Sequence, residues 1–284
     1  MSSSVIASLV SAYQQVIVYF GIPILALGLI GNSFNLIVFL SLRTFRESSC
    51  AFYLTIMSMV NIGVLLTSLL SRIMISGFDI DWTQYSLFYC KFRTYLFQVT
   101  AFISLACLCL ATIDQYLATC TRPRWQQWCN IRIARRLLLL ILFFIIIEQI
   151  PCLIYYVHIQ SSEKQICTIT NVLFVQVNAY LNYLILGNIT PFVTTFCFGL
   201  MAYRNIRQIA YRTVPLIRRE LDKQLSIMVL VQVAYVLLAI PPNFTMYMIG
   251  SYGNIQDSVV KAQVNLGYTI TLCIYYSYFA VSIN

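Results

Sequence analysis

The residues of this chain that could take part in chemistry stand at the two ends of one apolar stretch. Cys90 begins the stretch and the triplet Asp114-Gln115-Tyr116 ends it. A cysteine can form a disulfide in an oxidising compartment, and an acid, an amide and a phenol can hydrogen-bond a partner protein. Asp114 follows Cys90 by 24 residues, which as a helix extend about 36 Å at about 1.5 Å per residue. Such a helix crosses a hydrocarbon core of about 30 Å with one end on each side.

One face of this helix would carry a continuous row of side chains. Positions three or four residues apart share a face, because a helix has about 3.6 residues per turn. The row consists of Phe97, Ala101, Ser104, Leu108, Ala111 and Gln115. A helix with a crosslinkable outer end and a polar inner end would suit a protein that reports an outside event to the inside.

Groups for catalysis or metal binding are missing from the sequence pattern. We find no nucleophile–base pair and no phosphate-binding loop, so we expect neither enzymatic activity nor a cofactor. His158, the single histidine, has no cysteine or acid at ligand spacing. We therefore expect no metal site and interpret His158 as an interfacial side chain.

The composition indicates an integral membrane protein. Hydrophobic residues make up 60% of the chain and charged residues 10%, against about 45–50% and about 25% in soluble domains. Seven apolar segments each have the roughly 20 residues that a membrane helix needs. They cover residues 16–42, 50–75, 90–119, 134–157, 172–203, 225–249 and 259–284.

These segments predict an all-α membrane protein, a seven-transmembrane helix bundle that forms one domain over residues 1–284. Helices are expected because unpaired backbone groups are too costly in lipid. The segment after the fourth span, residues 158–171, is expected to be a loop. No further helix or cytoplasmic tail is expected after the seventh span.

The distribution of Lys and Arg predicts the orientation. The loops and flanks after spans one, three and five carry 13 of these residues, and the other side carries 5. Basic loops stay in the cytoplasm, so the N-terminus is expected outside the cell. The net charge of +9 is then a signal of topology and of contact with the lipid bilayer, and no nucleic-acid partner is expected. Contact with an acidic partner protein remains open.

Two of the ten cysteines, Cys90 and Cys167, fall on the expected outer side. A disulfide between them would pin the loop after span four over the mouth of the bundle. The alternative is two unrelated free thiols.

Short motifs stand in the spans and in the loops between them. They are Gly31-Asn32, Phe52–Asn61, Cys90 with Cys167, Asp114–Ala118, Pro123, Arg132, Ala134, Pro191, Tyr235 with Pro241, and Asn284. Together they resemble the rhodopsin-like (class A) G-protein-coupled receptors over the whole chain. The resemblance implies signal transduction to a heterotrimeric G protein. It assigns coupling and activation to Asp114, Gln115, Tyr116, Tyr235 and Pro241.

Three positions depart from that family pattern. Gln115 replaces the arginine of the family's Asp-Arg-Tyr triplet, so the resting contact with Asp114 loses its charge. Ala239 replaces a tryptophan two residues before Pro241, which removes an aromatic toggle. Asn61 replaces an acid, so the sodium pocket of the family is degenerate and binds sodium weakly. In this sequence that pocket would consist of Asn61, Ser104 and Asn284.

The resemblance places the ligand pocket between spans three, five, six and seven. Phe97 stands where amine receptors carry an aspartate, so a biogenic amine is not expected. The residues expected to face the pocket form an aromatic and amide set without charge: Phe97, Gln98, Ala101, Tyr183, Asn243, Tyr247 and Tyr278. Charged residues are expected at its rim: Asp79, Asp81, Lys91, Arg93, Glu163, Lys164, Asp257 and Lys261. An extracellular peptide is favoured, and a small neutral molecule or lipid is the alternative.

Other interpretations of the sequence stay open. Each pocket residue could serve ordinary helix packing. Glu148, an acid inside a span, could be a ligand counter-ion, a protonated side chain, or a structural partner of Gln149 or a neighbouring helix. We favour a plasma-membrane receptor. The rival classes are a seven-helix channel or transporter, and a degenerate receptor with weak coupling.

Overall fold

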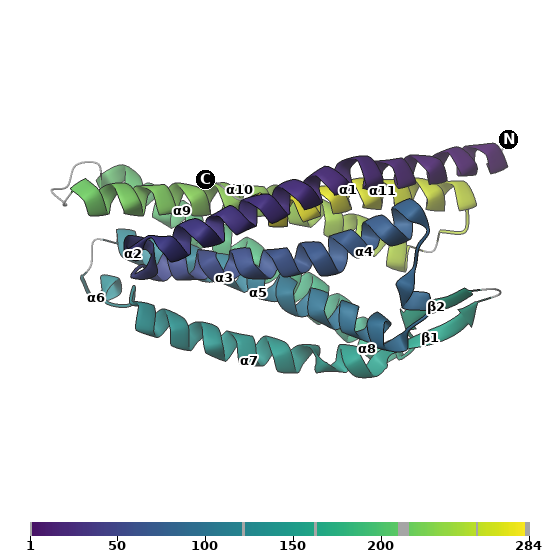
Figure 1. Ribbon diagram of the computed structural model, residues 1–284, viewed down its shortest axis with the longest axis horizontal. Helices are drawn as coiled ribbons and strands as arrows, with labels where there is room; N and C mark the ends of the chain where they lie inside the picture. Colours follow the sequence, from purple (N-terminus) through teal and green to yellow (C-terminus); the bar gives the residue numbers. More distant parts are fainter. Residues whose placement is uncertain (1, 121–122, 162–163, 210–215, 254, 282–284) are drawn as a thin grey trace.

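The computed structural model describes the chain apart from residues 1, 121–122, 162–163, 210–215, 254 and 282–284. Long helices run side by side and form a bundle (Figure 1). Five of them are nearly continuous: α1 (Ser2–Ser41), α5 (Leu87–Thr119), α7 (Ile131–Tyr155), α10 (Leu216–Tyr252) and α11 (Ser258–Ala280).

Two further spans are interrupted by π-helical turns. The second span consists of α3 (Ser49–Val64), a π-helical turn (Leu65–Leu69), α4 (Leu70–Arg72) and a second π-helical turn (Ile73–Gly77). The fifth span consists of α8 (Val172–Val177), a π-helical segment (Asn178–Ile189) and α9 (Thr190–Ile209). The remaining short pieces are α2 (Arg43–Arg46), α6 (Pro123–Gln126) and a 3-10 turn (Trp82–Gln84).

Six helical segments of the described chain are long and apolar enough to cross a membrane. The seventh, α11, has 23 residues and packs against α1 and α10. Its buried face includes Tyr276 and Tyr278, and such polar side chains lower its mean hydropathy. Large apolar side chains such as Leu139, Phe144 and Leu238 are exposed on the outside of the bundle, where lipid would cover them. The expected all-α membrane bundle is confirmed.

A β-hairpin lies where a loop was expected. Strands β1 (Tyr156–Ser161) and β2 (Lys164–Ile169) pair antiparallel, with His158 opposite Cys167. Pairing satisfies backbone groups that an open loop would leave to water. We call the end of the bundle that carries this hairpin the hairpin end; α2 and α6 lie at the opposite end (Figure 1).

Two helices begin earlier than expected. Helix α1 starts at Ser2 instead of residue 16, and α10 starts at Leu216 instead of residue 225. The expected bounds were those of the apolar segments, and a segment needs to be apolar only where it lies in lipid. A helix can continue into water when its residues have good helix propensity, as Arg, Glu, Leu and Lys at the start of α10 do.

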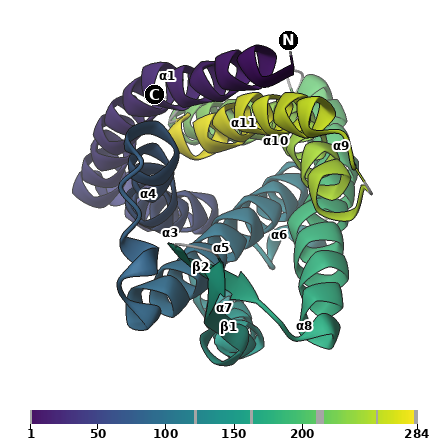
Figure 2. The same ribbon diagram turned by 90° about the vertical axis from the view of Figure 1, so that its right-hand side faces the viewer.

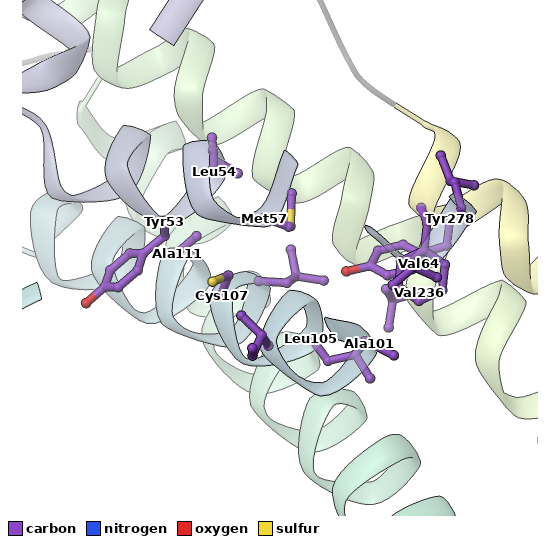
Figure 3. Packing of buried hydrophobic residues seen from close by; sticks show 14 of the residues in the cluster. Tyr53, Leu54, Met57, Val64, Ala101, Leu105, Cys107, Ala111, Val236 and Tyr278 are labelled. Carbon is purple, nitrogen blue, oxygen red and sulfur yellow. The ribbon is translucent and has the colours of Figure 1, made fainter. Parts of the chain in front are cut away.

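Helix α5 occupies the centre of the bundle and contacts α3, α7, α9 and α10. Its inward side chains are small or medium-sized, as Figure 3 shows for Ala101, Leu105, Cys107 and Ala111. Leu108 of the same helix is completely buried. Small residues let membrane helices approach closely, and dispersion contacts then hold them together.

Gly28 is a point of close packing between α1 and α11. A Cβ atom at this position would lie 2.8 Å from the Cβ of Ala280 and 3.0 Å from its Cα. The backbone of α11 would therefore have to move. We predict that Gly28→Val lowers the free energy of unfolding by roughly 1–3 kcal/mol, measured as a lower Tm of the purified protein in detergent.

Gly250→Val is the matched control, because a Cβ at this position would meet only Val264 Cγ1, at an ordinary van der Waals distance of 3.7 Å. An unchanged Tm in Gly28→Val would contradict the observed packing of α1 on α11.

Candidate functional site

A cavity of about 350 Å³ opens between the helices near the hairpin end. Its lining comes from the second, third, fifth, sixth and seventh spans and from the hairpin. Six of the seven residues expected to face a ligand line it: Phe97, Gln98, Ala101, Tyr183, Asn243 and Tyr247. The seventh, Tyr278, does not. It is 2% exposed and packs against Phe279, with Val64 and Val236 nearby (Figure 3).

The two interrupted spans supply several of the polar residues of the cavity wall. Arg72 lies after the first π-helical turn, and Asn182, Tyr183 and Asn188 lie within the π-helical segment of span five. A π-helical turn adds a residue to the helix and so rotates the next residues onto a different face, and such turns are frequent at functional sites. In this protein, the π-helical turns of the second and fifth spans lie at the wall of the cavity.

The cavity is charged, although a neutral lining was expected. Arg72, Arg93 and Asp81 all line it. The sequence offered a signal for Arg93, which precedes Phe97 by four residues and so shares its helix face. Arg72 could not be placed from a regular helical period, because a π-helical turn separates it from Asn61. Asp81 and Arg93 were expected only at the rim.

Glu148 belongs to a polar cluster that joins α5, α7 and the fifth span. Its carboxylate accepts hydrogen bonds from Gln149 and, with the Asn182 amide turned, from Asn182 at 2.6 Å. Gln98 donates to Asn178 Oδ1 (3.3 Å) and accepts from Cys152 Sγ (2.8 Å). Glu148 does not line the cavity, so the geometry favours the structural role among the alternatives.

A second polar cluster stands where the family resemblance indicated a degenerate sodium pocket. Ser104 Oγ donates to Asn61 Oδ1 (2.6 Å), and Asn61 Nδ2 donates to Asn32 Oδ1 (3.4 Å). Asn32 in turn donates to the Phe279 carbonyl (2.9 Å). Both the oxygen and the nitrogen of the Asn61 side chain are therefore hydrogen-bonded to protein groups. Asn284 lies outside the described residues.

The triplet at the opposite end of α5 contacts three other helices. The Ser49 hydroxyl of α3 lies 2.8 Å from both carboxylate oxygens of Asp114. The Ser226 hydroxyl of α10 donates to Gln115 Oε1 at 2.6 Å. Tyr116 packs its ring against Phe198 of α9. Each member of the triplet therefore ties α5 to a different neighbour.

Three residues of the sixth span were singled out in the sequence: Tyr235, Ala239 and Pro241. They lie on α10, on the hairpin side of Ser226. Tyr235 shares a hydrogen bond with Ser277 of α11, and Ala239 is buried. Pro241 has no N–H, and its carbonyl accepts a hydrogen bond from Thr245 Oγ1 at 2.9 Å. A proline within a helix removes a backbone hydrogen bond and favours a bend.

The hairpin is fastened across the cavity mouth by a disulfide. Cys90 of α5 is bonded to Cys167 of β2, and the hairpin lies beside α5 when the bundle is viewed from this end (Figure 2). Cys167 and its neighbour Ile166 line the cavity. His158 Nε2 lies 2.6 Å from the Thr83 carbonyl, which anchors the other strand. Among the described residues, no group of acids, cysteines and histidine has the geometry of a metal site.

The family model of the seven-transmembrane receptors (rhodopsin family) matches residues 31–281. The chain therefore belongs to this receptor family. A search of curated proteins found no match.

We predict that Cys90 and Cys167 form the disulfide in the purified protein. Peptide mapping after alkylation without reductant should recover the two cysteine peptides joined, with Cys197 alkylated because it is exposed and free. Replacing both Cys90 and Cys167 by serine should cost roughly 2–4 kcal/mol of stability. Cys197→Ser should leave Tm unchanged. Recovery of the Cys90 and Cys167 peptides as separate alkylated species would contradict the assignment.

Proposed function

We propose that this chain is a plasma-membrane receptor that binds an extracellular ligand in the cavity and signals to a heterotrimeric G protein at the opposite end. One observation carries the proposal. Helices α5 and α10 both line the cavity, through Phe97 and Asn243 among others. At the opposite end of the bundle the same two helices are joined by the hydrogen bond between Ser226 and Gln115. A ligand that changes how the two helices sit at the cavity therefore acts on the bond at their other ends.

The proposed orientation has two supports. A disulfide at the hairpin end suits the oxidising side of the membrane. The 13 basic residues after spans one, three and five, against 5 on the other side, suit the cytoplasm. In this orientation the cavity faces outward and Asp114-Gln115-Tyr116 faces the G protein.

The proposed mechanism is a shift of population. The bond between Gln115 and Ser226 favours the arrangement in which α10 is held against α5. A ligand that binds better to a second arrangement, with α10 swung outward at the cytoplasmic end, raises the population of that state. Pro241 stands on α10 at the level of the cavity, between Ile240 and Asn243, which both line it, and we propose that the helix bends there.

A peptide remains the favoured ligand. Aromatic rings of Tyr183 and Tyr247 stack at the cavity with centroids 4.6 Å apart, and such surfaces suit apolar or aromatic side chains. The cavity of about 350 Å³ is near the lower end of the range for ligand pockets, about 300–1,000 Å³. Only the end of a peptide would therefore enter it.

The buried polar groups argue against a channel. The cluster around Gln98, the cluster around Asn61 and the triplet at Asp114 make their hydrogen bonds within the protein. Leu105 and Leu108, both buried, lie on α5 between the cluster around Asn61 and the triplet at Asp114. The described side chains thus form separate polar levels instead of a continuous polar path.

We predict that Ser226→Ala raises basal nucleotide exchange on a G protein. The substitution removes the hydroxyl that bonds to Gln115, and a hydrogen bond contributes about 0.5–1.5 kcal/mol. Loss of that energy should raise exchange by roughly 2- to 10-fold, measured in membranes against a panel of G proteins. Ser251→Ala on the same helix is the matched control, because Ser251 is exposed.

Gln115→Arg tests the alternative of a degenerate receptor. A working receptor drives exchange above the level of empty membranes with Gln115 in place. Exchange that appears only in Gln115→Arg would mean that the fold is intact and coupling has been lost. Silence of the parent chain and of Ser226→Ala on every G protein would contradict the proposed function.

A further inference from the structure

Two arginines project into the cavity from neighbouring helices. Arg72 comes from α4 and Arg93 from α5, and both line the cavity wall. Their positive charges therefore act on the same small volume. Two like charges in a partly buried site are costly, because the surrounding medium screens them poorly.

No carboxylate of the described chain neutralises this pair by a direct ion pair. The ion pair found among the described residues, Arg43 with Glu47, involves neither of the cavity arginines. Arg93 Nε donates to the Thr67 carbonyl at 3.3 Å. Arg72 shares the cavity wall with the uncharged side chain of Tyr276. Thr67 and Tyr276 are both neutral, so they leave the charges of the two arginines uncancelled.

Asp81 is the acid that lines the same cavity, and its oxygens are already engaged. Its Oδ1 accepts from Thr83 N at 2.9 Å and from Thr83 Oγ1 at 2.5 Å, and its Oδ2 accepts from Gln84 Nε2 at 3.2 Å. Asp81 caps the short turn Trp82–Gln84. Two arginines and one aspartate leave the lining of the cavity with one excess positive charge.

We infer that the ligand carries a carboxylate that binds between Arg72 and Arg93. The inference rests on the proposed function, since it specifies the ligand of the same cavity. A planar guanidinium matches a carboxylate with two parallel hydrogen bonds, and this match is stronger in a dry site. The aromatic wall of Phe97, Tyr183 and Tyr247 then receives the apolar body of the ligand. The carboxylate can belong to the C-terminus of a peptide or to a small organic acid.

The test uses the full chain purified in lipid nanodiscs. Ligand binding is measured as a shift of Tm, detected with a thiol-reactive dye that reports exposure of the buried cysteines, such as Cys107 and Cys152. The probes are matched pairs. One arm compares 3-phenylpropionate and indole-3-acetate with their amides. The other compares tripeptides ending in phenylalanine with a free and with an amidated C-terminus.

The expected result is binding of acids and not of the matched amides. Probes are used at up to about 1 mM, where a ligand contributing about −4 kcal/mol is half bound. Arg72→Gln and Arg93→Gln should each weaken acid binding by about 10- to 100-fold, because hydrogen bonds to charged groups contribute about 1.5–3 kcal/mol. The arm with the tighter acid identifies the source of the carboxylate.

Lys91→Gln is the matched control. Lys91 also lies at the hairpin end, but it reaches the Ile154 carbonyl (3.4 Å) and does not line the cavity. Its loss should leave acid binding unchanged. If Arg72→Gln fails to fold, Arg93→Gln still tests the pair, and Arg72→Lys keeps the charge while removing the planar fork.

Three outcomes would overturn the inference: no acid of the panel binds, amides bind as well as acids, or acids bind equally well to the folded arginine variants. Basal nucleotide exchange is measured on the same preparations without any probe. Retained exchange together with one of these outcomes overturns the acidic ligand and leaves the receptor proposal standing. If the parent chain drives no nucleotide exchange, the result contradicts the receptor proposal instead.

Discussion

The polar side chains of helix α5 must find their partners inside the protein, because lipid offers no hydrogen bonds. The arrangement of the other helices depends on how this requirement is met. From one end to the other, α5 is tied by Cys90 to the hairpin, by Gln98 to the fifth span, by Ser104 to the second and by Gln115 to the sixth. Buried apolar side chains, such as Leu105 and Leu108, lie between the Ser104 and Gln115 contacts. Helix α5 is thus the element against which the cavity and the opposite end are both positioned.

Neutral hydrogen bonds replace charges at two places where the family resemblance led us to look for ions. Asn61 binds Ser104 and Asn32, so the region that resembles a sodium pocket is closed by protein groups. Gln115 accepts a hydrogen bond from Ser226 in place of a charged contact. Neutral bonds contribute less than charge-assisted ones. In the proposed mechanism, the two arrangements of α10 therefore differ by a small free energy. A small difference in ligand affinity between them would be enough to shift their populations.

Apolar run lengths predicted the bundle, and the distribution of Lys and Arg placed Cys90 and Cys167 on the same side of it. The family resemblance indicated the six residues that line the cavity. Prediction from the sequence failed where geometry departs from a regular helix. The π-helical turn before Arg72 changes which side chains face inward. Tyr278 was misplaced for a different reason. On a regular helix, residues two apart point in nearly opposite directions, so Tyr276 lines the cavity and Tyr278 enters the core. The hairpin after α7 depends on backbone pairing, which apolar run lengths do not reveal.

The most direct test of the central claim is the distance between α10 and α7 at the end opposite the hairpin. Spin labels at the exposed positions Ile227 and Arg136 would report it by pulsed electron paramagnetic resonance in nanodiscs. If the bond between Gln115 and Ser226 holds α10 in place, Ser226→Ala should increase the population of longer distances, and Ser251→Ala should not. Identical distance distributions in the parent and in Ser226→Ala would contradict the account.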